Sequence, residues 1–152
     1  MSVIADRLRE LGLELPAVPP AGGNYVPAVQ TGNLLYTSGN VPHGAAKPKG
    51  RVGADLTLEE GYAAARQCVL NCLAGAQSVI GDLDRIARVV KVLGFVNGAP
   101  DFDAYPKVIN GASDTLVEIF GDQGRHARSA VGLNVPGNFA TEVEIIFELK
   151  QD

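Results

Sequence analysis

Residues 57–80 read TLEEGYAAARQCVLNCLAGAQSVI, and this stretch has the spacing of an amphipathic helix. Thr57 stands three residues before Glu60, the capping-box arrangement of a helix N-terminus. Apolar side chains then recur on one helical face, namely Leu58, Tyr62, Ala65, Val69, Cys72, Leu73, Ala76 and Ile80. The sequence therefore predicts one long helix that ends at Gly81.

Segments with strand character lie on both sides of this helix. Residues 25–30 and 34–41 are rich in β-branched and aromatic residues and flank a tight-turn sequence, so they predict a hairpin. The apolar run 85–96 predicts a third strand. A second helix is expected from about residue 105 to residue 120.

Two alternating runs follow, at residues 128–135 and 139–149, and Pro136-Gly137-Asn138 joins them. Alternation around a short turn predicts a second hairpin. In that hairpin, Arg128 would face away from the core, on the same side as Glu142.

With the turn centred on Gly137, Gly132 would lie opposite Glu142 and Ala130 opposite Glu144. The small side chains of Ala130 and Gly132 would leave room for a ligand beside Arg128. Two interpretations stay open from the residues alone. One is an exposed cross-strand ion pair worth less than about 1 kcal/mol. The other is a site where the guanidinium binds a carboxylate and a glutamate handles water.

The order hairpin, helix, strand, helix, hairpin predicts an α+β fold, a single sheet with two helices packed on one face. The other sheet face must then meet water or another subunit. Residues 1–15 carry apolar side chains at helical spacing and predict an accessory helix. Residues 16–152 fit one domain.

Composition limits the classes of function. The 46% hydrophobic and 20% charged residues are ordinary for a soluble domain. A net charge of -4 argues against a nucleic-acid partner, because such binding needs clustered Lys and Arg. Residues 1–15 hold five charged side chains, so neither a signal peptide nor a membrane span is expected, and we expect a cytoplasmic protein.

No metal or cofactor is expected from the sequence. The two cysteines, Cys68 and Cys72, would share a helix face, and a zinc site would need two more ligands. Buried structural thiols are the favoured interpretation. The two histidines are His43, expected in a solvated loop, and His126, which is either an exposed loop residue or a pH-sensitive ligand contact.

Four motifs together resemble the RidA/YjgF family. They are YVPAVQ at 25–30, GNLLYTSGNVP at 32–42, ARSAV at 127–131 and EVE at 142–144. The chain also departs from the family pattern, since Ala130 stands where the family has cysteine and Asn40 where it has glutamine. The segment 110–114 and the loop 124–126 also differ from typical deaminase members, and they indicate a resemblance to a divergent subgroup.

The resemblance implies a chorismate-mutase-like fold and a homotrimer with pockets between subunits. It implies that Arg128 clamps the carboxylate of an imine or enamine acid and that Glu142 orients the hydrolytic water, while Tyr25, Ser38 and Gly39 line the pocket. Ala130 and Asn110 are further candidates for substrate contact.

Hydrolytic deamination is the leading hypothesis for the function, and whether the protein is an enzyme stays open. The alternative is noncatalytic binding of a small carboxylate metabolite by the same arginine. The older family label of endoribonuclease is disfavoured by the negative charge.

Overall fold

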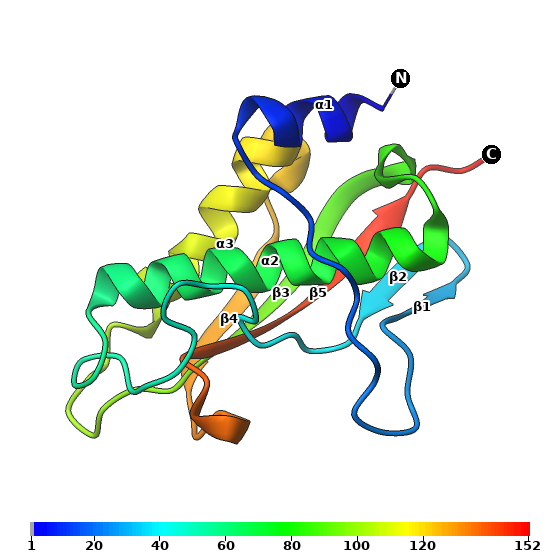
Figure 1. Ribbon diagram of the computed structural model, residues 1–152. Helices are drawn as coiled ribbons and strands as arrows, with labels where there is room; N and C mark the ends of the chain where they lie inside the picture. The colour runs from blue at the N-terminus through cyan, green and yellow to red at the C-terminus, as the bar shows by residue number, and fades with distance from the viewer. Residues whose placement is uncertain (1) are drawn as a thin grey trace.

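The structure is a computed structural model and describes residues 2–152. These residues form three α-helices and five strands, with short 3₁₀ turns between them, arranged as in Figure 1. In chain order the elements are α1 (Val3–Glu10), β1 (Ala28–Thr31), β2 (Leu34–Thr37), α2 (Leu58–Ile80), η1 (Leu83–Arg85), β3 (Ile86–Val96), α3 (Tyr105–Phe120), η2 (Gly121–Gly124), β4 (Ala127–Gly132), η3 (Pro136–Asn138) and β5 (Thr141–Leu149).

The five strands form one sheet in the order β1-β2-β5-β3-β4. Neighbouring strands are antiparallel except for β3 and β4, which are parallel. Helices α2 and α3 lie together on one face of this sheet (Figure 1). The α+β class and the two-helix layer are therefore confirmed.

The predicted hairpin of the last two strands is wrong. Strand β4 pairs only with β3, and β5 lies between β2 and β3. The turn Pro136–Asn138 is a short 3₁₀ segment within the connection 133–140, and this connection is long enough to pass β3. Alternation identifies a strand but carries no information about its partner, so two consecutive strands looked like neighbours when they are not.

Helix α2 follows the sequence pattern closely. The Thr57 hydroxyl accepts from Glu60 N at 3.1 Å, and the Glu60 carboxylate accepts from Thr57 N at 3.0 Å, so the capping box is complete. Gly81 ends the helix with a φ of 83°, a conformation that glycine adopts without strain.

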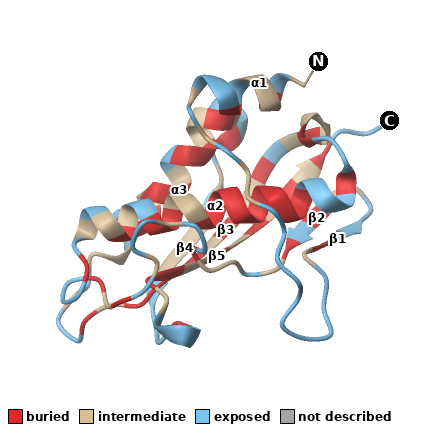
Figure 2. Cartoon of the chain, in the orientation of Figure 1, coloured by how far each residue is buried: buried red, intermediate tan, exposed pale blue. Residues whose placement is uncertain are grey.

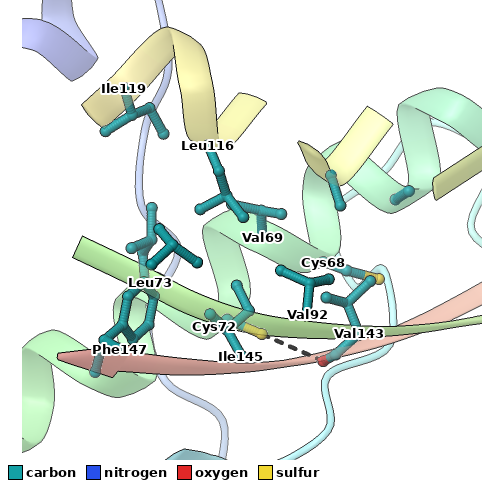
Figure 3. Close-up of a cluster of buried hydrophobic side chains, with 14 of the residues drawn as sticks. Cys68, Val69, Cys72, Leu73, Val92, Leu116, Ile119, Val143, Ile145 and Phe147 are labelled. Carbon is teal, nitrogen blue, oxygen red and sulfur yellow. Dashed lines mark hydrogen bonds between the residues drawn. The ribbon is translucent and has the colours of Figure 1, made fainter. Parts of the chain in front are cut away.

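The core lies between α2, α3 and the sheet, as the buried residues in Figure 2 show. Figure 3 shows Val69 and Leu73 of α2 among side chains of the sheet and of α3. Cys68 and Cys72 are both fully buried free thiols, as expected. Burial raises the pKa of the Cys72 thiol to about 12, and its sulfur donates to the Val143 carbonyl at 3.3 Å, which is the dashed line in Figure 3.

Helix α1 packs at one end of this core. Ile4 and Leu8 are buried there, and the Asp84 carboxylate accepts from Val3 N and Ile4 N at 2.8 Å each. Residues 16–24 then run as an exposed segment past α2 to the first hairpin (Figure 1). Within residues 2–152 no helix is long and apolar enough to cross a membrane.

The sheet face opposite the helices carries apolar side chains. Tyr36 pairs with Ile146, and Phe95 pairs with Val131 across the parallel strands. Tyr36 is 42% exposed and Val131 is 44% exposed. Exposed aliphatic and aromatic side chains gathered on one face are typical of a surface that meets another protein chain.

Candidate functional site

A pocket of about 360 Å³ opens where the chain leaves β2, and we call it the β2 pocket. Its walls come from the exposed segment, from the residues after β2, from α2 and from β5. Its lining residues are Val18, Pro19, Pro20, Ala21, Gly22, Tyr25, Pro27, Ser38, Gly39, Asn40, Val41, His43, Asn71, Gly75 and Glu142.

Hydrogen bonds fix the backbone of this corner. Ser38 N donates to the Pro27 carbonyl at 2.9 Å, and the Ser38 hydroxyl donates to the Val26 carbonyl at 2.6 Å. Asn40 and Val143 exchange backbone hydrogen bonds of 2.9 and 3.0 Å. The intervening Gly39 is therefore held against β5.

Glu142 lies directly against Gly39. A Cβ at position 39 would stand 2.6 Å from Oε2 of Glu142, so only glycine allows this approach. Burial raises the pKa of the Glu142 carboxyl above its usual value, and the charge of Glu144 raises it further. A carboxyl with a raised pKa is suited to exchanging protons near neutral pH.

Tyr25 stands at the rim of the pocket. It is 57% exposed, and its hydroxyl accepts from Gly22 N at 3.3 Å. The structure thus brings together four of the residues that the sequence singled out, namely Tyr25, Ser38, Gly39 and Glu142.

His43 and Asn71 are polar lining residues that the sequence analysis did not assign to a site. His43 is exposed, as expected of a loop residue, but it also lines the pocket, and its ring packs edge-on against Phe139 at 4.9 Å. Asn71 donates to the carbonyls of Val41 and His43 at 2.9 and 3.1 Å. The sequence held part of the evidence for Asn71, because a polar side chain within a largely apolar helix needs a hydrogen-bond partner.

Arg128 lies elsewhere, in a second polar group that we call the Arg128 cluster. Its Nη1 donates to the Ser113 hydroxyl at 3.1 Å, and its Nη2 donates to the Pro106 carbonyl at 3.3 Å. The Ser113 oxygen is also 2.9 Å from Nε2 of His126, and Nδ1 of His126 is 2.6 Å from the Gly124 carbonyl. The cluster thus joins α3 to the start of β4.

Arg128 and Glu142 point to opposite faces of the sheet. Arg128 pairs with Val92, which pairs with Ile145, and both partners are buried beneath the helices. Glu142 pairs with Phe95 on the other face. Directly opposed residues of neighbouring strands share a face, so the expectation that Arg128 and Glu142 face the same way is wrong.

The physical reason is the position of β4 at the edge of the sheet. Ser129 and Val131 form the more apolar side of β4, yet they face away from the helices. An edge strand can turn its apolar side outward when that face is uncovered within the chain. Alternation alone therefore assigned the two sides of β4 the wrong way round.

The remaining candidates also lie on the helix side. Ala130 packs against the core, and the space beside Gly132 is filled by the ring of Tyr105, so the predicted room for a ligand next to Gly132 is absent. Asn110 lies half-buried in α3, three residues before Ser113.

Comparison with known proteins assigns the chain to a family. Residues 5–147 match the family model described as "YjgF/chorismate_mutase-like, putative endoribonuclease". The chain belongs to the YjgF family. Protein TCP17 of Trypanosoma cruzi is 44% identical over 150 residues, which cover 96% of this chain and 94% of that protein.

Solved structures differ in how similar they are to this chain in sequence identity and TM-score. Protein Atu1372 of Agrobacterium tumefaciens, of unknown function, is 42% identical with a TM-score of 0.89, covering 97% of this chain and 93% of that one. The YjgF gene product of Escherichia coli is 27% identical with a TM-score of 0.62, covering 88% and 94%. These values fit a divergent subgroup with the chorismate-mutase-like fold.

Proposed function

We propose that this protein hydrolyses reactive 2-imino or enamine acids to 2-oxo acids and ammonia, in sites that two subunits of a homotrimer complete. The observation that carries the proposal is the separation of Arg128 and Glu142 on opposite faces of one sheet. If both act on one substrate, they come from different chains. YjgF family membership supports a role in binding or processing small molecules.

The uncovered sheet face supports an assembly. Tyr36, Phe95, Val131 and Ile146 contribute apolar surface to it beside the charged side chains of Lys91, Glu142 and Glu144, a mixed composition that favours contact with another copy of the chain. Glu142 lies on this same face, where a neighbouring subunit of the proposed trimer would approach it. A trimer would therefore bring residues of one chain to the β2 pocket of the next.

The chemistry needs few groups because an imine is already electrophilic. The planar guanidinium of Arg128 would hold the substrate carboxylate through two parallel hydrogen bonds. Glu142 would take a proton from water as the water oxygen bonds to the imine carbon, and would return that proton to nitrogen. The hydroxyl of the resulting carbinolamine then loses its proton, by way of Glu142, to the same nitrogen as the carbon–nitrogen bond breaks, so ammonia leaves and a 2-oxo acid remains.

Ammonia release from an amino-acid oxidase reaction tests the activity. Added wild-type protein should accelerate release, and Arg128→Ala and Glu142→Gln should each remove the acceleration. Arg125→Ala is a matched control, because Arg125 is an exposed arginine whose side chain pairs with Asp122 at 3.6 Å. Wild type and Arg128→Ala of equal rate would refute the proposal, whereas Arg128-dependent binding without turnover would select the noncatalytic alternative.

Mixed assemblies test whether the site is shared between chains. Arg128→Ala and Glu142→Gln subunits, unfolded and refolded together, should regain activity, because some interfaces receive Arg128 from one chain and Glu142 from the other. Random mixing restores about a quarter of the sites in a cyclic trimer. A stable monomer in light scattering, or mixtures as inactive as their components, would contradict the shared site.

A further inference from the structure

The Arg128 cluster contains two residues to which the proposed reaction assigns no role, Ser113 and His126. We propose that Ser113 donates a further hydrogen bond to the carboxylate that Arg128 holds, and that His126 is the positioning residue that frees the Ser113 hydroxyl by taking up a proton when the anion binds. This inference rests on the proposed function, since it assumes that a small carboxylate reaches Arg128.

The hydrogen bonds define the tautomer of neutral His126. The Gly124 carbonyl can only accept, so the 2.6 Å contact requires a proton on Nδ1 of His126. In neutral His126 the other nitrogen, Nε2, must then accept, and the Ser113 hydroxyl donates to it across 2.9 Å. The Ser113 oxygen in turn accepts from Nη1 of Arg128 at 3.1 Å.

Protonation of His126 reverses the direction of the hydrogen bond between His126 and Ser113. Nε2–H becomes a donor, and the Ser113 oxygen accepts from both His126 and Arg128. The hydroxyl hydrogen is then released to point toward an anion at the guanidinium. One proton taken from solvent thus converts Ser113 from a donor to histidine into a donor to the ligand.

Charge favours the same coupling. Burial lowers the pKa of His126 below its usual value, the Gly124 carbonyl opposes this effect, and the positive charge of Arg128 adds to the lowering. A bound carboxylate would offset the charge of Arg128 and raise the pKa of His126 toward neutrality. By linkage, binding then takes up protons, and affinity increases as pH falls through this range.

Other charged groups near the cluster have partners of their own. Asp114 of α3 accepts from the Tyr62 hydroxyl at 2.7 Å. Asp122 of η2 pairs with Arg125 at 3.6 Å, and Arg88 of β3 donates to the Arg125 carbonyl at 3.0 Å. Arg128 is therefore the charged side chain in closest connection with His126, through Ser113.

Nuclear magnetic resonance of the two histidines tests the inference directly. Pyruvate serves as the probe, because it is a stable 2-oxo analogue of an imino acid, and methyl pyruvate is the control that lacks the carboxylate. The sequence holds only His43 and His126, and His126→Gln assigns the signals. Saturating pyruvate should raise the pKa of His126 by about one unit, which corresponds to about tenfold tighter binding to the protonated form.

Substitutions at residue 113 test whether the Ser113 hydroxyl acts through its hydrogen bond or only fills space. Ser113→Ala should lose most of the affinity gained between about pH 8 and pH 5.5, whereas Ser113→Thr should retain it because the hydroxyl is kept. His126→Gln should bind pyruvate with little dependence on pH over this range. Ser78→Ala is the control, because that hydroxyl donates within α2 to the Gly75 carbonyl.

The outcomes distinguish the two proposals. This inference is overturned if pyruvate binding needs Arg128 but leaves the pKa of His126 unchanged. It is also overturned if Ser113→Ala and wild type bind pyruvate equally at both pH values. Either result leaves the proposed function standing. Pyruvate binding that is absent, or unaffected by Arg128→Ala, overturns both.

Discussion

Gly39 and Glu142 are in such close contact that a side-chain carbon at residue 39 would stand 2.6 Å from Oε2 of the glutamate. Gly39 is held by the hydrogen bonds that Asn40 makes with Val143, so the backbone cannot retreat freely. The placement of this carboxylate therefore depends on a residue that has no side chain.

Replacing Gly39 by alanine should displace the Glu142 carboxylate while sparing the fold, because the colliding atoms are at the end of a flexible side chain. We expect the proposed deaminase activity to fall about a hundredfold, as is typical when a reacting group is shifted by about 1 Å. Steady-state rates measure this loss, and thermal unfolding should change little. In the Glu142→Gln background, Gly39→Ala should leave pyruvate binding unchanged; weaker binding there would show that Gly39 acts in another way.

The raised pKa of Glu142 predicts how stability depends on pH. In the folded state this carboxyl keeps its proton to higher pH than the unfolded value of 4.5. The unfolding free energy contributed by Glu142 is therefore fully present below pH 4.5 and is lost as pH rises through the folded pKa.

Urea unfolding of wild type and Glu142→Gln across this range measures the effect. The stability of wild type relative to the variant should decrease with rising pH. Asp84 has a lowered pKa, which gives the opposite slope at lower pH, but it is present in both proteins and cancels in the difference. A difference that is constant with pH would show that Glu142 titrates normally.

The core should be sensitive at Phe147, which is fully buried and lies 6.3 Å from the ring of Phe120. Phe147→Ala should reduce the free energy of unfolding by about 3–5 kcal/mol, because it removes a large buried side chain and leaves a cavity. Val79→Ala on the exposed side of α2 should cost no more than about 0.5 kcal/mol. Urea unfolding at matched chain concentration compares them, and equal losses would contradict the packing described.

The capping box of α2 gives a fourth prediction. Thr57→Ala removes the hydroxyl that accepts from Glu60 N and should cost about 0.5–2 kcal/mol of unfolding free energy. Thr57→Ser keeps the acceptor and should cost much less. Denaturant unfolding of the two variants is sufficient, and a serine variant as unstable as the alanine variant would exclude the cap as the cause.

Local sequence signals predicted the helices well. The Thr57–Glu60 box and Gly81 mark the ends of α2 at the observed residues, and the predicted span 105–120 is that of α3. These signals work because helix ends are stabilised by contacts among residues a few positions apart.

Strand pairing was predicted less well because it depends on contacts between distant residues. Arg128 of β4 pairs with Val92 of β3, and the whole of α3 lies between these two residues in the sequence. No pattern within residues 127–149 could therefore predict the pairing. The faces of β4 were misassigned for the same reason. The motifs around Tyr25, Ser38 and Glu142 nevertheless identified residues that line one pocket, at the end of β2. Each motif could be recognised from its own short stretch of sequence.

The wall of the β2 pocket formed by residues 18–22 is exposed and belongs to no helix or strand. Insertions, deletions or exchanges there would alter which molecules fit while leaving the packed layers intact. Ligand preference can thus change during evolution through substitutions confined to this one short segment. Glu142, on β5, would keep its position beside this segment.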